Sequence, residues 1–409
     1  MIKNSFKMKE IAIKNLLKLI EIIKSDEGIF LSINTAEKIK LKNEILKFLS
    51  KNEIAGKNSS KKFLDKQLTK YLLEAKREQN PRNPEDFINH MIEYDRQEFI
   101  VTEVFLPFSG GKISSPISLF DCDIEEYNEN LRKVILQSIH KVVSVNTKYS
   151  EDQKKKLIAE NEKYLLKTGD FLVLRYKAKR ERELVIENAQ EKFAALLRVC
   201  NLISLFECNP NDGICFLPGV SQINIHHNKI DVSQATANFS IPLFGGKTLY
   251  LNDVLLSNIY EPIIRIYSDY LSGKKMNYPD DKIKHSILWA SNANISFSFE
   301  TKILNIIIAI ETLIPKQKGN SIVSYISESV AFILGQNAEG KKYYYNLMKH
   351  LYDERGKLAH GSGTKLSELD YNNALSIYAE LLTYLINNKN LFKNEKELLE
   401  LVLEKKFGN

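Results

Sequence analysis

Apolar positions in the first ninety residues recur with the spacing of amphipathic helices. Three such stripes predict helices over residues 9–24, 35–50 and 60–76. The run QNPRNPED, residues 79–86, contains two prolines and closes this stretch. We therefore expect a helical front section.

The pattern then becomes mixed. EFIVTEVFLPFSGG, residues 98–111, predicts a strand that enters a glycine-rich turn, and DFLVLRYKA, residues 170–178, predicts a second strand. Helical spacing covers residues 124–145, 151–166 and 182–206.

Short segments rich in β-forming residues follow, separated by Gly, Asn and Asp. They are GICFLPG (213–219), SQINIHHNKIDVS (221–233) and KTLYLND (247–253). This composition predicts a small sheet, or a hairpin with an added strand.

Helical spacing dominates from Val254 onward. Pro315 and Gly335 are expected to end two of the helices, and Ser367 with Asp370 forms a capping box that starts the last one. The predicted helices cover residues 254–273, 280–293, 299–315, 321–335, 341–355 and 367–388. Short connections between them predict an antiparallel bundle of five or six helices.

The fold class expected from these patterns is α+β and predominantly helical. We expect an N-terminal mixed region with a small sheet over residues 1–250, and a C-terminal antiparallel helical bundle over residues 251–409. The length of 409 residues also favours two or three domains over one.

The composition is typical of a soluble globular protein rather than a disordered or membrane protein. Hydrophobic residues make up 44% of the chain and charged residues 27%. Lys14 and Lys18 interrupt the apolar start, which favours an amphipathic helix over a signal peptide. The longest apolar run, residues 303–314, is far short of the roughly 20 residues that span a bilayer. With no export signal, the four cysteines favour reduced thiols and the cytoplasm.

A set of Cys and His residues and the net charge are each compatible with a ligand, but neither requires one. Cys208, Cys215, His226 and His227 suggest a zinc site, but their gaps match no common finger, and adjacent histidines on a strand point to opposite faces. We therefore expect no metal. The net charge of +7, from 58 basic and 51 acidic residues, permits an RNA partner.

The most distinctive stretch is LYDERGKLAHGSG, residues 351–363. Arg355 precedes His360 by five positions, and each is followed by a glycine, which favours a helix that frays near Glu354 and a turn in which the two side chains converge. Such a pair suits metal-free cleavage of RNA, with histidine moving protons and arginine stabilising phosphoryl charge. The same two residues also fit the ordinary end of a helix, where cations are favoured.

The wider pattern resembles the HEPN family (higher eukaryotes and prokaryotes nucleotide-binding), and most closely its Apea-like branch. The resemblance covers about residues 254–390 and rests on YDERGKLAHG, with Tyr352 three positions before the arginine, and on AIETLIP, which contains Glu311. It implies a HEPN helical bundle with Arg355 and His360 as the catalytic pair. Glu311 also fits a purely structural acid in an apolar helix.

The resemblance implies a homodimeric, metal-independent endoribonuclease that leaves a 2′,3′-cyclic phosphate and needs no cofactor. Such proteins act in anti-phage defence, including abortive infection, or as toxins. Tyr352, Lys357 and Glu311 are expected to bind or support the RNA. Residues 1–250 are expected to sense a phage-derived trigger or regulatory protein, or to select the RNA. The basic run RYKAKRER, residues 175–182, fits either an RNA contact or a solvated corner.

Two alternatives remain. Active family members usually have a polar residue where this chain has Gly356, which favours a catalytically inactive HEPN-like module that binds nucleotide or protein. The other alternative is a helical scaffold in which the motif is a coincidence.

Overall fold

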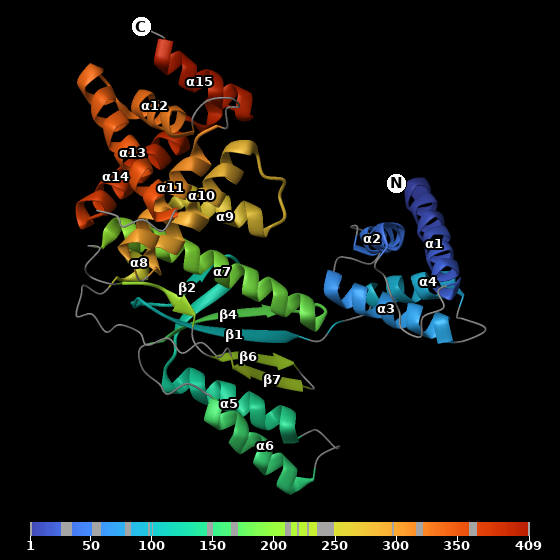
Figure 1. The fold of residues 1–409 in the computed structure, drawn as a ribbon. Coiled ribbons are helices and arrows are strands. Elements are labelled where there is room, and N and C mark those ends of the chain that lie inside the picture. Colours follow the sequence, from blue (N-terminus) through green and yellow to red (C-terminus); the bar gives the residue numbers. More distant parts are fainter. Residues whose placement is uncertain are drawn as a thin grey trace.

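The computed structural model describes residues 2–25, 35–50, 59–77, 83–96, 99, 101–144, 150–164, 171–208, 214–218, 221–226, 229–234, 249–296, 298–315, 322–359 and 366–407. Within these described residues helices predominate, and the strands all lie before residue 235 (Figure 1). The expected α+β class, with a sheet in the N-terminal part and helices in the C-terminal part, is confirmed.

The helices before residue 250 are α1 (Ile2–Ser25), α2 (Ala36–Ser50), α3 (Lys61–Arg77), α4 (Pro84–Arg96), α5 (Glu129–Ser144), α6 (Glu151–Tyr164) and α7 (Arg182–Glu207). The strands are β1 (Thr102–Ser109), β2 (Ile117–Leu119), β3 (Cys122–Glu126), β4 (Leu172–Ala178), β5 (Leu217–Pro218), β6 (Ser221–His226) and β7 (Lys229–Gln234). The helices after residue 250 are α8 (Leu251–Leu255), α9 (Glu261–Leu271), α10 (Tyr278–Asn294), α11 (Phe299–Leu313), α12 (Ile322–Leu334), α13 (Ala338–Ala359), α14 (Glu368–Asn388), the 3-10 helix η2 (Lys389–Leu391) and α15 (Glu395–Phe407).

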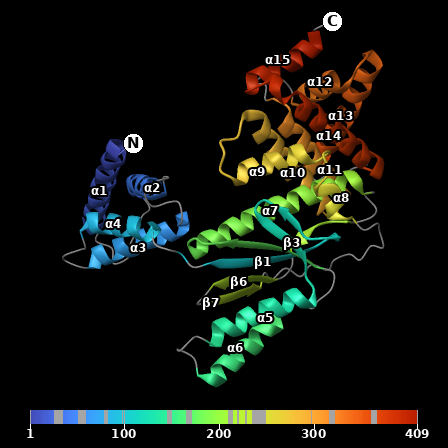
Figure 2. The ribbon, with the colours of Figure 1, turned by 180° about the vertical axis from the view of Figure 1, so that it is seen from behind.

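The first four helices form a bundle with a core of its own. Apolar residues spaced three or four apart, such as Leu16, Leu19 and Ile23 on α1, are buried against the other three helices. This bundle lies to one side of the sheet and approaches it through α3 and the start of α7 (Figures 1 and 2).

The described strands form one antiparallel sheet in the order β2-β3-β4-β1-β6-β7, with β5 paired to β1. Alternate residues of a strand point to opposite faces. On β1, Val104, Leu106 and Phe108 join the core on the α7 side, while Phe105 joins a smaller core with α5 and α6. Helices therefore cover both faces, which explains the almost continuous burial of β1.

The core between the sheet and α7 continues without a break into the C-terminal helices. It contains buried residues from Val104 on β1 to Val402 on α15. α7 lies between the sheet and α10, as Figure 1 shows. Among the described residues, this core includes Phe216 and Leu251, which lie on the two sides of the predicted domain boundary near residue 250. The boundary itself stays a prediction.

Several predicted elements differ in their limits. The helix expected over residues 254–273 is split, because α8 ends at Leu255 and Pro262 fits the first turn of a new helix, α9. The helix expected from residue 124 begins only at Glu129, after β3. Of the described residues of KTLYLND, Tyr250 forms an isolated bridge with Lys112, and Leu251–Asp253 belong to α8. Residues 235–248 lie outside the described residues. Helices α4 and α15 lie in segments where we predicted none.

Gly335 follows the end of α12, as predicted, and close packing explains why a glycine is found there. It has no positive φ among the described backbone, but a Cβ at this position would lie 2.5 Å from the backbone nitrogen of Lys341. The glycine therefore allows the start of α13 to approach the end of α12.

Within the described residues, no helix has the length and apolar character that crossing a lipid bilayer requires.

Candidate functional site

Three of the predicted site residues lie together where α13 crosses α11. Tyr352 and Arg355 come from α13 and Glu311 from the last turn of α11. Buried Met348 and Leu351 fix the face of α13 that packs on the bundle. The motif with Tyr352 and the motif with Glu311 therefore form one cluster, although these two residues are 41 positions apart in the sequence.

One carboxylate oxygen joins this cluster. The Tyr352 hydroxyl donates a hydrogen bond of 2.7 Å to Oε1 of Glu311, and a terminal nitrogen of Arg355 lies 3.4 Å from the same oxygen. The guanidinium carbon lies 5.6 Å from the centre of the Tyr352 ring. Glu311 is thus satisfied by a phenol and a cation, as a half-buried acid requires.

The position of Glu311 depends on the end of α11. Lys282 on α10 donates hydrogen bonds to the carbonyl oxygens of Thr312, at 3.1 Å, and Ile314, at 2.8 Å. These carbonyls would otherwise lack partners at a helix end. Lys282 therefore holds the turn that carries Glu311 against α10.

Burial and charge keep the Tyr352 phenol neutral. Burial raises the pKa of Tyr352, and the negative charge of Glu311 and the hydrogen bond to it raise the pKa further, while Arg355 opposes them. Tyr352 as a whole is 3% exposed, so its hydroxyl acts as a fixed hydrogen-bond donor to Glu311. Tyr352 is consequently a residue that orients the cluster.

Arg355 remains accessible within this cluster. Its side chain is 35% exposed, and its buried Nε has no hydrogen-bond partner among the described residues. The ion pair with Glu311 engages one terminal nitrogen. The guanidinium is therefore oriented but retains N–H groups for an anion.

Helix α13 does not fray near Glu354, which corrects our expectation. The helix continues through Gly356 to Ala359. Glu354 is 4% exposed and pairs with Lys357 one turn further on, so this part of the helix is anchored. One helical glycine costs only about 1 kcal/mol relative to alanine, which the anchored turns offset.

His360 is the residue after the end of α13 and lies outside the described residues. The convergence of Arg355 and His360 therefore stays a prediction.

Lys357 is separate from the Glu311 cluster. It is two residues from Arg355, about 200° around the helix, and it pairs with Glu354. Its role in supporting RNA stays a prediction.

A contact that we did not predict ties α13 to the start of α14. Nε2 of His350 lies 3.0 Å from Oδ1 of Asp370, and the other carboxylate oxygen accepts hydrogen bonds from the backbone and hydroxyl of Ser367. The capping box at Ser367 is confirmed. Burial would raise the pKa of Asp370, but the bonds from Ser367 and His350 outweigh it and the pKa is lowered.

The cysteines and the zinc candidate show no metal arrangement among the residues that the structure describes. No group of three or more His, Cys, Asp or Glu side chains there is placed to hold an ion. Cys208 and Cys215 form no disulfide with the other described residues, His226 ends β6, and His227 lies outside the described residues.

The basic run at residues 175–182 is partly engaged within the fold. Nε of Arg175 lies 2.6 Å from Glu103, and another nitrogen lies 3.3 Å from Glu125, across neighbouring strands. Glu181 caps α7, which begins at Arg182. A contact of this run with RNA stays a prediction.

Comparison with known proteins found no match to the chain among family models, curated proteins or solved structures. Membership of the HEPN family therefore stays a prediction that rests on the residues themselves.

Proposed function

We propose that this chain is a metal-independent endoribonuclease of the HEPN type. The observation that carries the proposal is the placement of Arg355, which Glu311 and Tyr352 orient in the last turns of α13, five residues before His360. An oriented arginine with accessible N–H groups fits a phosphoryl group, which is the centre of RNA cleavage.

In the proposed reaction the ribose 2′-oxygen attacks the neighbouring phosphorus, and the bond from phosphorus to the 5′-oxygen breaks. The products are a 2′,3′-cyclic phosphate and a 5′-hydroxyl. Arg355 stabilises the charge that develops on the phosphoryl oxygens, because its guanidinium stays protonated and its planar fork matches two oxygens.

Two protons must move in this reaction. A base takes the proton of the 2′-hydroxyl, and an acid supplies one to the departing 5′-oxygen. His360 fits either role, because an imidazole titrates near neutral pH, and such help contributes about 10²- to 10⁴-fold to the rate.

One histidine cannot act as base and acid in the same event, so we propose a two-fold homodimer. A C2 interface places the same residues of both copies about one axis. The second copy would supply a second Arg355 and His360 to a shared cleft. The C-terminal helices, which contain the motif, are the proposed interface.

The proposed setting is the bacterial cytoplasm, in anti-phage defence through abortive infection or as a toxin. Residues 1–250 would then sense a phage-derived trigger, contact a regulatory protein or select the RNA.

A catalytically inactive HEPN-like module that binds nucleotide or protein is the second candidate. Gly356 favours it, because active family members usually have a polar side chain there. A Cβ at Gly356 would meet no atom within 4 Å, so packing does not require the glycine.

Growth and RNA integrity after induced expression in bacteria test the proposal. Wild type is expected to slow growth and fragment cellular RNA, and Arg355→Ala and His360→Ala are expected to relieve both effects. Arg265→Ala is the matched control, because Arg265 is an exposed arginine of α9 whose partner is Glu261. It is expected to behave as wild type.

Equal toxicity of all four proteins would contradict the nuclease. Binding of nucleotide or protein without RNA cleavage by wild type would favour the inactive module.

A further inference from the structure

Positive charge is concentrated at the front of the chain. Residues 1–96 contain 20 Lys and Arg against 14 Asp and Glu, whereas the remaining residues contain 38 against 37. Nearly all of the net charge of +7 therefore belongs to the segment that contains α1–α4. The candidate catalytic helices lie in the nearly neutral part.

Within the bundle the charge is concentrated further. Helices α2 and α3 together contain ten Lys and Arg against four Asp and Glu. Helix α4 has the opposite balance, with Arg96 as its one basic residue and four acids. The bundle therefore has a basic side formed by α2 and α3.

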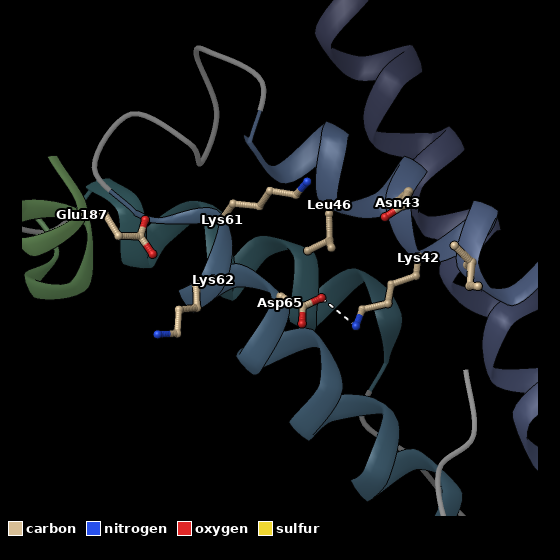
Figure 3. Close-up of a pocket in the computed structure, with 8 residues that line it drawn as sticks. Lys42, Asn43, Leu46, Lys61, Lys62, Asp65 and Glu187 are labelled. Atoms are coloured by element: carbon tan, nitrogen blue, oxygen red, sulfur yellow. Dashed lines mark ion pairs between the residues drawn. The ribbon is translucent and has the colours of Figure 1, made fainter. Parts of the chain in front are cut away.

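A groove of about 570 Å³ lies on this basic side, between α2 and α3 and next to the start of α7. Lys42, Lys61 and Lys62 line it with Asn43 and Asp65, and Figure 3 shows the Lys61 side chain extending toward α2. Lys42 lies 2.7 Å from Asp65, the ion pair drawn in Figure 3. One lysine of the groove is thus neutralised by an acid on α3.

Lys61 and Lys62 have a different environment. Both are exposed, and no ion pair joins Lys61 to any residue in the described part of the chain. They occupy the first turn of α3, which contains no acid, although the helix dipole disfavours cations there. Their placement therefore does not serve helix stability.

The acid that faces this turn is Glu187 of α7. Burial raises the pKa of Glu187, and the positive charge of Lys62 opposes that shift. Lys62 thus has a carboxylate in its surroundings, whereas Lys61 projects into the groove (Figure 3).

We infer that the groove between α2 and α3 binds the phosphate backbone of single-stranded RNA, with Lys61 and Lys62 as its main contacts. The choice of RNA over other anions rests on the proposed ribonuclease function. Lysine binds phosphate as a point charge and releases condensed counterions, so this contact is independent of sequence and sensitive to salt. The bundle would then hold substrate for the C-terminal site.

Salt-dependent RNA binding tests the inference. The full-length His360→Ala chain, in which the proposed cleavage is blocked, is titrated against a short labelled single-stranded RNA of mixed sequence between about 50 and 200 mM salt. Lys61→Gln with Lys62→Gln is expected to reduce the slope of log K against log salt by about 0.7 for each lysine. Lys393→Gln with Lys396→Gln, two exposed lysines of the C-terminal segment, is the charge-matched control.

An unchanged slope in the Lys61 and Lys62 variant would overturn the inference, as would an equal decrease in the control pair. An acidic peptide that competes fully with the RNA at equal charge would also overturn it.

The two proposals fail separately. If wild type cleaves RNA but the Lys61 and Lys62 substitutions leave the salt slope unchanged, the inference about the groove is wrong and the proposed nuclease activity is retained. If these substitutions reduce the salt slope but wild type leaves RNA intact, the proposed nuclease activity is wrong and the inference about the groove is retained.

Discussion

The Arg355 guanidinium lies 3.4 Å from the Glu311 carboxylate, so that an ion pair joins α13 to α11. The same carboxylate oxygen accepts the Tyr352 hydroxyl. Arg355 therefore has a defined orientation before any ligand arrives, as a group that stabilises a transition state requires.

The Tyr352→Phe substitution tests the support that this cluster gives. It keeps the buried ring but removes the hydroxyl, so Glu311 loses its shortest hydrogen bond. A hydrogen bond to a charged group contributes about 1.5–3 kcal/mol to stability. Because Glu311 is partly exposed, we expect the free energy of unfolding, measured in urea, to fall by an amount near the lower end of that range.

Tyr343→Phe is the matched control. Tyr343 is on the same helix and is 56% exposed, so its hydroxyl is not enclosed by the fold. We expect no measurable change, and an equal loss in both variants would contradict the role of the Glu311 contact.

Gly356→Ala is expected to stabilise the protein by about 0.5–1 kcal/mol, because glycine inside a helix is less favourable than alanine. The open surroundings of Gly356 allow the added methyl group. Gly335→Ala is expected to destabilise, since its Cβ would clash with the backbone of Lys341. Thermal unfolding of both variants checks this, and a lower melting temperature for Gly356→Ala would contradict the helical assignment.

Asp370 predicts a pH dependence of stability. The pKa of Asp370 in the folded protein is lower than its ordinary value of 3.8. The ionised carboxylate therefore contributes its full stabilisation above about pH 4, and this stabilisation is lost as the pH falls through the pKa of the folded state. The difference in unfolding free energy between wild type and Asp370→Asn should be largest near neutral pH and should shrink below about pH 4.

Asp353→Asn, an exposed acid on α13, is the control for this titration. A difference between wild type and Asp370→Asn that stayed constant from pH 6 to pH 3 would show that the carboxylate charge is not involved.

Replacing Lys192 is expected to lower the stability of the protein. This buried lysine of α7 donates a hydrogen bond of 2.5 Å to the carbonyl of Phe120. Phe120 and Asp121 have φ of 55° and 54°, a conformation that costs roughly 1–2 kcal/mol for a residue other than glycine. Lys192→Met should lower stability by about 1–3 kcal/mol in urea unfolding, because a buried carbonyl loses its donor.

Lys133→Met, at an exposed position of α5, is the control for Lys192 and is expected to have little effect. Stability unchanged by Lys192→Met would mean that the turn holds without this lysine.

Local patterns made much of the C-terminal fold predictable. Ser367 and Asp370 are three residues apart, so the capping box that starts α14 could be identified from sequence alone. The helix expected over residues 254–273 was misplaced because its division depends on Pro262, which fits the first turn of α9. Glycine gave a wrong expectation at Gly356, because the sequence does not show that Glu354 is buried and anchors that part of α13.

The candidate site was predictable only in part. Tyr352, Arg355 and Glu311 could be selected from motifs, but their contact depends on the crossing of two helices distant in sequence. The contact between His350 and Asp370 had no sequence signal, because the capping box already accounts for Asp370, His350 fits an ordinary helix surface, and only packing brings the two to 3.0 Å.

The ends of RNA fragments made by purified protein test the central claim most directly. A defined RNA is incubated with wild type, Arg355→Ala and His360→Ala in the presence of EDTA. The account predicts that wild type alone produces fragments with 2′,3′-cyclic phosphate and 5′-hydroxyl ends. Cleavage that EDTA abolishes, or that persists in either variant, would contradict it.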